Sequence, residues 1–68
     1  MKREGLIAFR GERSQKQMAK IYGVTQQAWC KWENGDGKPS VITMKRLEKD
    51  SGISMTTLFA DVFDNHKL

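Results

Sequence analysis

Apolar residues recur at helical spacing along the chain, in short segments that glycine or proline separates. Leu6 and Phe9 lie three positions apart in the first segment, as do Met44 and Leu47 in the fourth, which is typical of amphipathic helices. The β-branched run 41–43 is too short to indicate a strand. We therefore predict five short helices around one small core, within residues 2–10, 14–23, 25–35 and 40–52 and from residue 54 onward.

Hydroxyl residues mark the expected starts of these helices. Ser14 and Gln17 have the spacing of a capping box, in which a hydroxyl and an amide satisfy two free backbone N–H groups. Thr25 is suited to cap the next helix through its side-chain oxygen. In that helix Trp29 and Trp32 share one side, which predicts that they face the core.

Residues 14–35 form the pattern of two helices joined by a tight turn that contains glycine, which is the pattern of a helix-turn-helix. Gln26 and Gln27 lie near the start of the second helix, and a carboxamide can pair with both N6 and N7 of adenine in the major groove. Lys31, one turn further on, would reach a guanine edge or a phosphate. The same side chains are also ordinary for a solvated helix face, so periodicity alone leaves both interpretations open.

Length and chemistry exclude several classes of protein. The 68 residues allow one domain, 1–68, with a thin stability margin. Cys30 is the only cysteine, and with His66 it supplies too few ligands for a structural zinc ion, so we expect no cofactor. No acid–base pair, nucleophile arrangement or phosphate-cradling loop indicates an enzyme. No apolar run approaches the roughly 20 residues that cross a bilayer, so we expect a soluble, cytoplasmic protein without a membrane partner.

The charge is distributed unevenly. The chain has a formal net charge of +4, and residues 13–32 contain no acid, since all eight Asp and Glu lie outside them. If these residues form two adjoining helices, one surface is basic and suits an anionic partner. An ordinary solvated face is the competing interpretation. The basic residues of this segment are Arg13, Lys16, Lys20 and Lys31.

The segment also resembles a known family, the Cro/repressor or XRE-like helix-turn-helix regulators. The resemblance covers about residues 6–59, and the Thr-Gln-Gln opening at Thr25 is especially similar to lambdoid phage repressors. It implies an all-α, five-helix, lambda-repressor-like DNA-binding domain with its core in residues 14–35. It further implies a bacterial or phage-encoded homodimer that binds a pseudo-palindromic double-stranded operator and represses, or sometimes activates, a nearby promoter. The matching residues are Ser14-Gln15-x-x-Met18-Ala19-x-x-x-Gly23-Val24-Thr25-x-x-x-Trp29-x-x-Trp32-Glu33-Asn34-Gly35.

The resemblance implies roles for individual positions. Arg10 and Glu33 would form an internal ion pair that ties the third helix to the first, and Gln15 would brace Gln26. The implied base contacts are Gln26, Gln27 and Lys31. The implied phosphate contacts are Gln15, Lys16, Thr25, Asn34 and Lys38.

Three apolar residues near the end of the chain have two interpretations. Phe59, Val62 and Phe63 either complete the core of the monomer or form a dimer interface within residues 54–68, and the resemblance favours the interface. A different function also stays open, namely a helical module that binds a protein partner, as an antitoxin does. Such a module would bind DNA weakly and with little dependence on salt, and the absence of acids from residues 13–32 argues against it.

Overall fold

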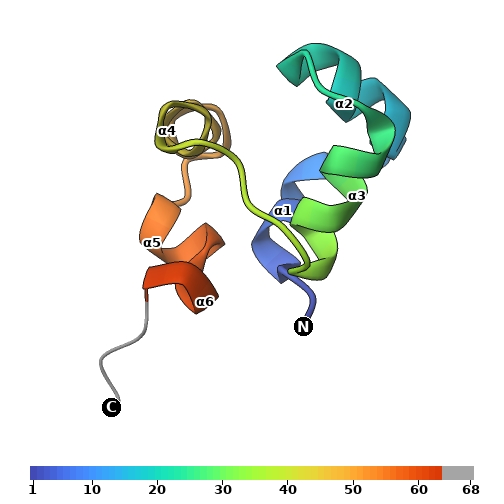
Figure 1. The fold of residues 1–68 in the computed structure, drawn as a ribbon. Helices are drawn as coiled ribbons and strands as arrows, with labels where there is room; N and C mark the ends of the chain where they lie inside the picture. The colour runs from blue at the N-terminus through green and yellow to red at the C-terminus, as the bar shows by residue number, and fades with distance from the viewer. Residues whose placement is uncertain (64–68) are drawn as a thin grey trace.

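The computed structural model describes residues 1–63, and within them the chain forms six helices and no strand (Figure 1). The all-α class is confirmed. None of the described helices is long and apolar enough to cross a membrane. In chain order the helices are α1 (Glu4–Arg10), α2 (Gln15–Tyr22), α3 (Gln26–Asn34), α4 (Val41–Ser51), α5 (Met55–Leu58) and α6 (Ala60–Phe63).

The helices are arranged in two halves. Helices α1, α2 and α3 lie together in one half, α4, α5 and α6 lie in the other, and the segment 35–40 connects them (Figure 1). Gly5 allows the halves to approach closely, because a Cβ atom at this position would lie 3.0 Å from Cδ2 of Leu58. A side chain at position 5 would therefore make a tight contact with Leu58 of α5, which glycine avoids.

Hydroxyl caps begin the helices as predicted. Ser14 accepts a hydrogen bond from the backbone of Gln17 at 3.0 Å, and the Gln17 side chain accepts one from the backbone of Ser14 at 2.8 Å, which completes the capping box. Thr25 caps α3 by accepting a bond from the backbone of Ala28 at 3.0 Å. The first helix begins at Glu4 rather than at residue 2, because Arg3 has an extended backbone and a buried side chain.

The two tryptophans of α3 lie in the core, as predicted. Trp29 is fully buried and stacks on Tyr22 with 5.7 Å between ring centroids, and the ring of Trp32 is tilted against that of Trp29 with 5.5 Å between centroids. Their rings contribute a large share of the apolar surface that this small domain removes from water. The buried apolar residues are Leu6, Met18, Ala19, Tyr22, Trp29, Trp32, Met44, Leu47, Leu58 and Phe59.

The predicted last helix is divided in two at Phe59, whose backbone (φ −121°, ψ 43°) leaves the helical region. Leu58 at the end of α5 and Phe59 at the break are both buried in the core. The assignment of Phe59 to a dimer interface is therefore wrong, because its side chain is 0% exposed within the monomer. Val62 is half-buried against the same core, and Phe63 is 40% exposed. The rest of the expected dimerisation segment, 64–68, lies outside the described residues.

A buried carboxylate joins the three helices of the first half. Glu33 of α3 accepts hydrogen bonds from Arg10 of α1 at 2.6 and 3.2 Å and from Gln15 of α2 at 3.0 Å. The indole of Trp29 donates a further bond to it. Burial alone would raise the pKa of Glu33, but these hydrogen bonds and the charge of Arg10 outweigh it and hold the pKa below its ordinary value of 4.5. Glu33 with these three donors is called the Glu33 cluster below.

We expect Glu33→Gln to lower the free energy of unfolding by about 1–3 kcal/mol at neutral pH, because the substitution removes charge-assisted hydrogen bonds. The folded-state pKa is depressed, so the stabilisation is complete above the unfolded pKa of 4.5 and is lost as pH falls through the lower folded value. Urea unfolding of wild type and Glu33→Gln from neutral to acid pH measures this stabilisation. The difference in the free energy of unfolding between the two proteins should shrink in acid. A difference that stays constant with pH would contradict the role assigned to the Glu33 carboxylate. Glu12→Gln, at an exposed acid, is the control.

Candidate nucleic-acid interface

Helices α2 and α3 form a helix-turn-helix with a tight turn at Gly23. Gly23 adopts a left-handed conformation (φ 68°, ψ 32°), which costs glycine little and ends α2. The backbone of Val24 then bonds to the carbonyl of Ala19 at 2.9 Å, and Thr25 starts α3. The turn therefore sets the direction of α3 through local backbone geometry.

The first turn of α3 and the side of the helix away from the tryptophans face solvent. Gln26 and Gln27 in its first turn are exposed, and so is Lys31 one turn later. Trp29 is buried beneath them, and the Glu33 cluster holds the C-terminal part of the helix. The three residues expected to contact bases thus share an accessible surface on a helix whose inner side is firmly packed.

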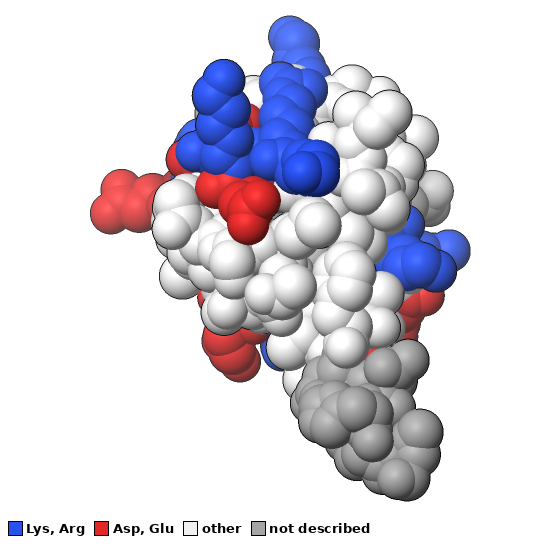
Figure 2. Space-filling view, turned by 90° about the vertical axis from the view of Figure 1, so that its left-hand side faces the viewer, with Lys and Arg blue, Asp and Glu red and all other residues white. Residues whose placement is uncertain are grey.

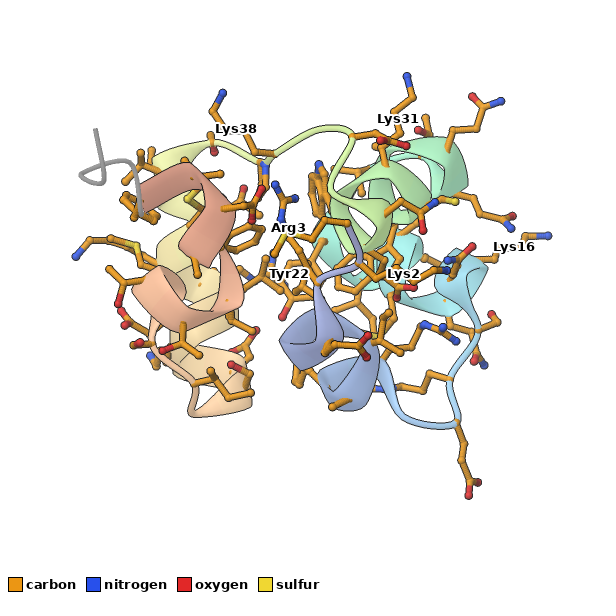
Figure 3. All side chains as sticks on the ribbon, turned by 90° about the horizontal axis from the view of Figure 1, so that it is seen from below. Lys2, Arg3, Lys16, Tyr22, Lys31 and Lys38 are labelled. Atoms are coloured by element: carbon orange, nitrogen blue, oxygen red, sulfur yellow. The ribbon has the colours of Figure 1, made fainter. Side chains whose placement is uncertain are left out.

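The expected phosphate contacts lie on both flanks of α3. Lys16, in the first turn of α2, and Lys38, in the segment 35–40, are exposed. Lys31 and Lys38 project to the same side of the molecule, and Lys16 lies at the α2 edge (Figure 3). Thr25 is exposed, and its oxygen accepts the capping bond, so its hydroxyl hydrogen is available to a phosphate oxygen.

Two of the expected phosphate contacts are partly engaged within the protein. The amide of Gln15 bonds to Glu33 and, among the described residues, not to Gln26, so the expected brace between these glutamines is not observed. One amide hydrogen and the backbone N–H of Gln15 remain for a phosphate. The amide of Asn34 donates to the sulfur of Cys30 at 3.4 Å, and Asn34 is half-buried.

The ion pair between Arg10 and Glu33 that the resemblance implies is present, with Nε and Oε2 2.6 Å apart. Glu33 is 2% exposed and fully hydrogen-bonded, so its negative charge is compensated inside the fold. The surface formed by α2 and the first turns of α3 therefore carries positive charge without acidic neighbours from its own segment. The face of α4, by contrast, shows Lys and Arg side chains beside Asp and Glu side chains (Figure 2).

Sequence reasoning missed several polar connections between the halves of the molecule, among them those of Tyr22 and Arg3. The hydroxyl of Tyr22 donates to Asp50 of α4 at 2.6 Å, and the guanidinium of Arg46 lies 4.4 Å from the Tyr22 ring centroid. Burial first, and then the bond to Asp50, raise the pKa of Tyr22. Arg3 makes another connection, to Asp61 of α6 at 2.8 and 2.9 Å. No local pattern marks these partners, which are far apart in the sequence.

Comparison with known proteins agrees with this geometry. A family model described as "Helix-turn-helix" matches residues 8–58, which include α2, α3 and the connecting segment 35–40. Searches of curated proteins and of solved structures found no match. The matched family consists of DNA-binding transcription regulators and is not an enzyme family. With more than half of its residues in the match, the chain belongs to the Cro/repressor-type, or XRE, helix-turn-helix family of DNA-binding regulators.

Proposed function

We propose that the protein reads a specific double-stranded operator by placing α3 in the major groove, with Gln26, Gln27 and Lys31 at base edges. One observation carries this proposal: Gln26 and Gln27 are exposed in the first turn of a helix that Trp29 and Trp32 anchor in the core. A recognition helix needs this division, because one side must anchor it while the residues near its N-terminus reach the bases. Glutamine and lysine favour adenine and guanine respectively.

Phosphate contacts on either side of α3 would set its register on the duplex. Lys16 and Lys38 supply charge, while Thr25 and Asn34 supply neutral donors, and Gln15 offers its backbone N–H at the start of α2. Such contacts release counterions from DNA, so binding should weaken steeply with salt. A helical module that binds a protein partner instead would lack this dependence.

We further propose a dimer that represses transcription from a pseudo-palindromic operator, in a bacterial or phage setting. Phe63 at the end of α6 is 40% exposed, and half-buried Val62 lies beside it, which supports a small contact face for a second copy. Two-fold symmetry would place the half-sites about 10 bp apart, or a multiple of that distance. Phe59 has no part in this face.

Selection of random duplex DNA followed by sequencing tests the proposal, and Gln26→Ala and Gln27→Ala test the base contacts. We expect an inverted-repeat consensus, on which each substitution costs about 1–3 kcal/mol of binding free energy. Binding to an unrelated duplex should change little, because phosphate contacts are retained. Equal losses on both duplexes would show that these glutamines do not read bases, and a consensus without inverted symmetry would contradict the dimer.

Lys38→Ala tests the phosphate contact in the segment 35–40. We expect equal weakening on selected and unrelated DNA, with the slope of log affinity against log salt reduced by about 0.9. Lys49→Ala is the matched control, since Lys49 is an exposed lysine in the last turn of α4, away from α3 in the sequence and the fold. If the two variants had the same salt slope, Lys38 would not be a phosphate contact.

A further inference from the structure

Arg3 is an arginine with an unusual degree of burial. Its side chain is 2% exposed, although it lies next to the start of the chain. One guanidinium nitrogen donates both to the carbonyl of Trp32, at 2.9 Å, and to the carbonyl of Gly37. The other two nitrogens donate to Asp61, and the guanidinium lies 5.0 Å from the ring centroid of Phe59. In Figure 3 Arg3 lies between the two halves of the molecule.

The two carbonyls that Arg3 joins belong to the parts of the proposed interface that must keep a fixed separation. Trp32 lies in α3, and Gly37 directly precedes Lys38 in the segment 35–40. A guanidinium is planar and presents its donors in a rigid fork, so bonding to both carbonyls restricts their relative position. These two bonds therefore fix the backbone that precedes Lys38 relative to α3.

Asp61 holds the guanidinium from the opposite side. Its carboxylate, 26% exposed, accepts both of the remaining donors, and these bonds from Arg3 lower the pKa of Asp61. The backbone N–H of Arg3 also bonds to the carbonyl of Glu33 at 2.7 Å. The position of the segment 35–40 therefore depends on α6 as well as on α3.

We propose that Arg3 is a positioning residue for DNA binding, which fixes the segment that carries Lys38 relative to α3 and, through Asp61, makes this position depend on α6. This inference rests on the proposed function. For the loss of the Asp61 charge, positioning and simple electrostatics predict opposite changes in DNA affinity. Removing the acid at Asp61 makes the protein more positive and would by itself favour DNA, whereas losing the position of Lys38 would weaken binding.

Asp61→Asn is the decisive variant, compared with Glu12→Gln, which removes an equal charge from an exposed acid. We expect Asp61→Asn to bind the selected duplex about tenfold more weakly and Glu12→Gln to bind it as well as wild type or better. Arg3→Lys keeps the net charge but loses the fork, and it should weaken binding similarly. Asp61→Glu, which retains the carboxylate, should recover part of the loss.

Hydrogen exchange and NMR shifts of the free protein at Gly37 and Lys38 separate positioning from general destabilisation. We expect both amides to change in Asp61→Asn but not in Tyr22→Phe, which removes a different polar connection between the halves. Unchanged amides in Asp61→Asn, or a gain in affinity equal to that of Glu12→Gln, would overturn the proposal. If wild type selected no DNA sequence, the proposed function would fail, while the amide measurements would still decide whether Arg3 positions the segment.

Discussion

The buried carboxylate of Glu33 is the interaction on which the arrangement of the first three helices depends. Moving a carboxylate out of water is costly, and the cost is offset only where several donors meet the charge. Arg10, Gln15 and Trp29 provide these donors from α1, α2 and α3, so the ion is stable only when the three helices have their native relative positions. Removing one of its partners would leave the charge buried and uncompensated, so the cluster restricts the relative positions of α1, α2 and α3.

This geometry gives α3 a packed inner side and an exposed outer surface. Trp29 and Glu33 attach the inner side, so Gln26 and Gln27 can be exposed without loss of order in the backbone that carries them. The second half of the molecule is joined to the first through the apolar core and through polar contacts that include those of Arg3 and Tyr22. The segment 35–40 connects the two halves, and Arg3 bonds to it at the carbonyl of Gly37.

The sequence predicted those features that local rules determine. Ser14 and Thr25 cap helices because their spacing to the following backbone is local, and the inward side of α3 follows from the periodicity of its tryptophans. The ion pair of Arg10 and Glu33 came from the family resemblance rather than from periodicity. Features that depend on distant partners were missed. Arg3 and Asp61 are 58 positions apart, and the apolar spacing of residues 58–63, which suits one continuous helix, did not predict the break at Phe59.

An NMR titration of the ¹⁵N-labelled protein with the selected operator duplex tests most directly whether α3 presents its glutamines to DNA. The signals to observe are those of the side-chain amide groups. We expect the amide signals of Gln26 and Gln27 to shift strongly on binding, while that of Gln17, which is engaged in the capping box, should shift little. Shifts confined to α4, α5 and α6, with the signals of Gln26 and Gln27 unchanged, would contradict the claim that α3 presents its glutamine side to DNA.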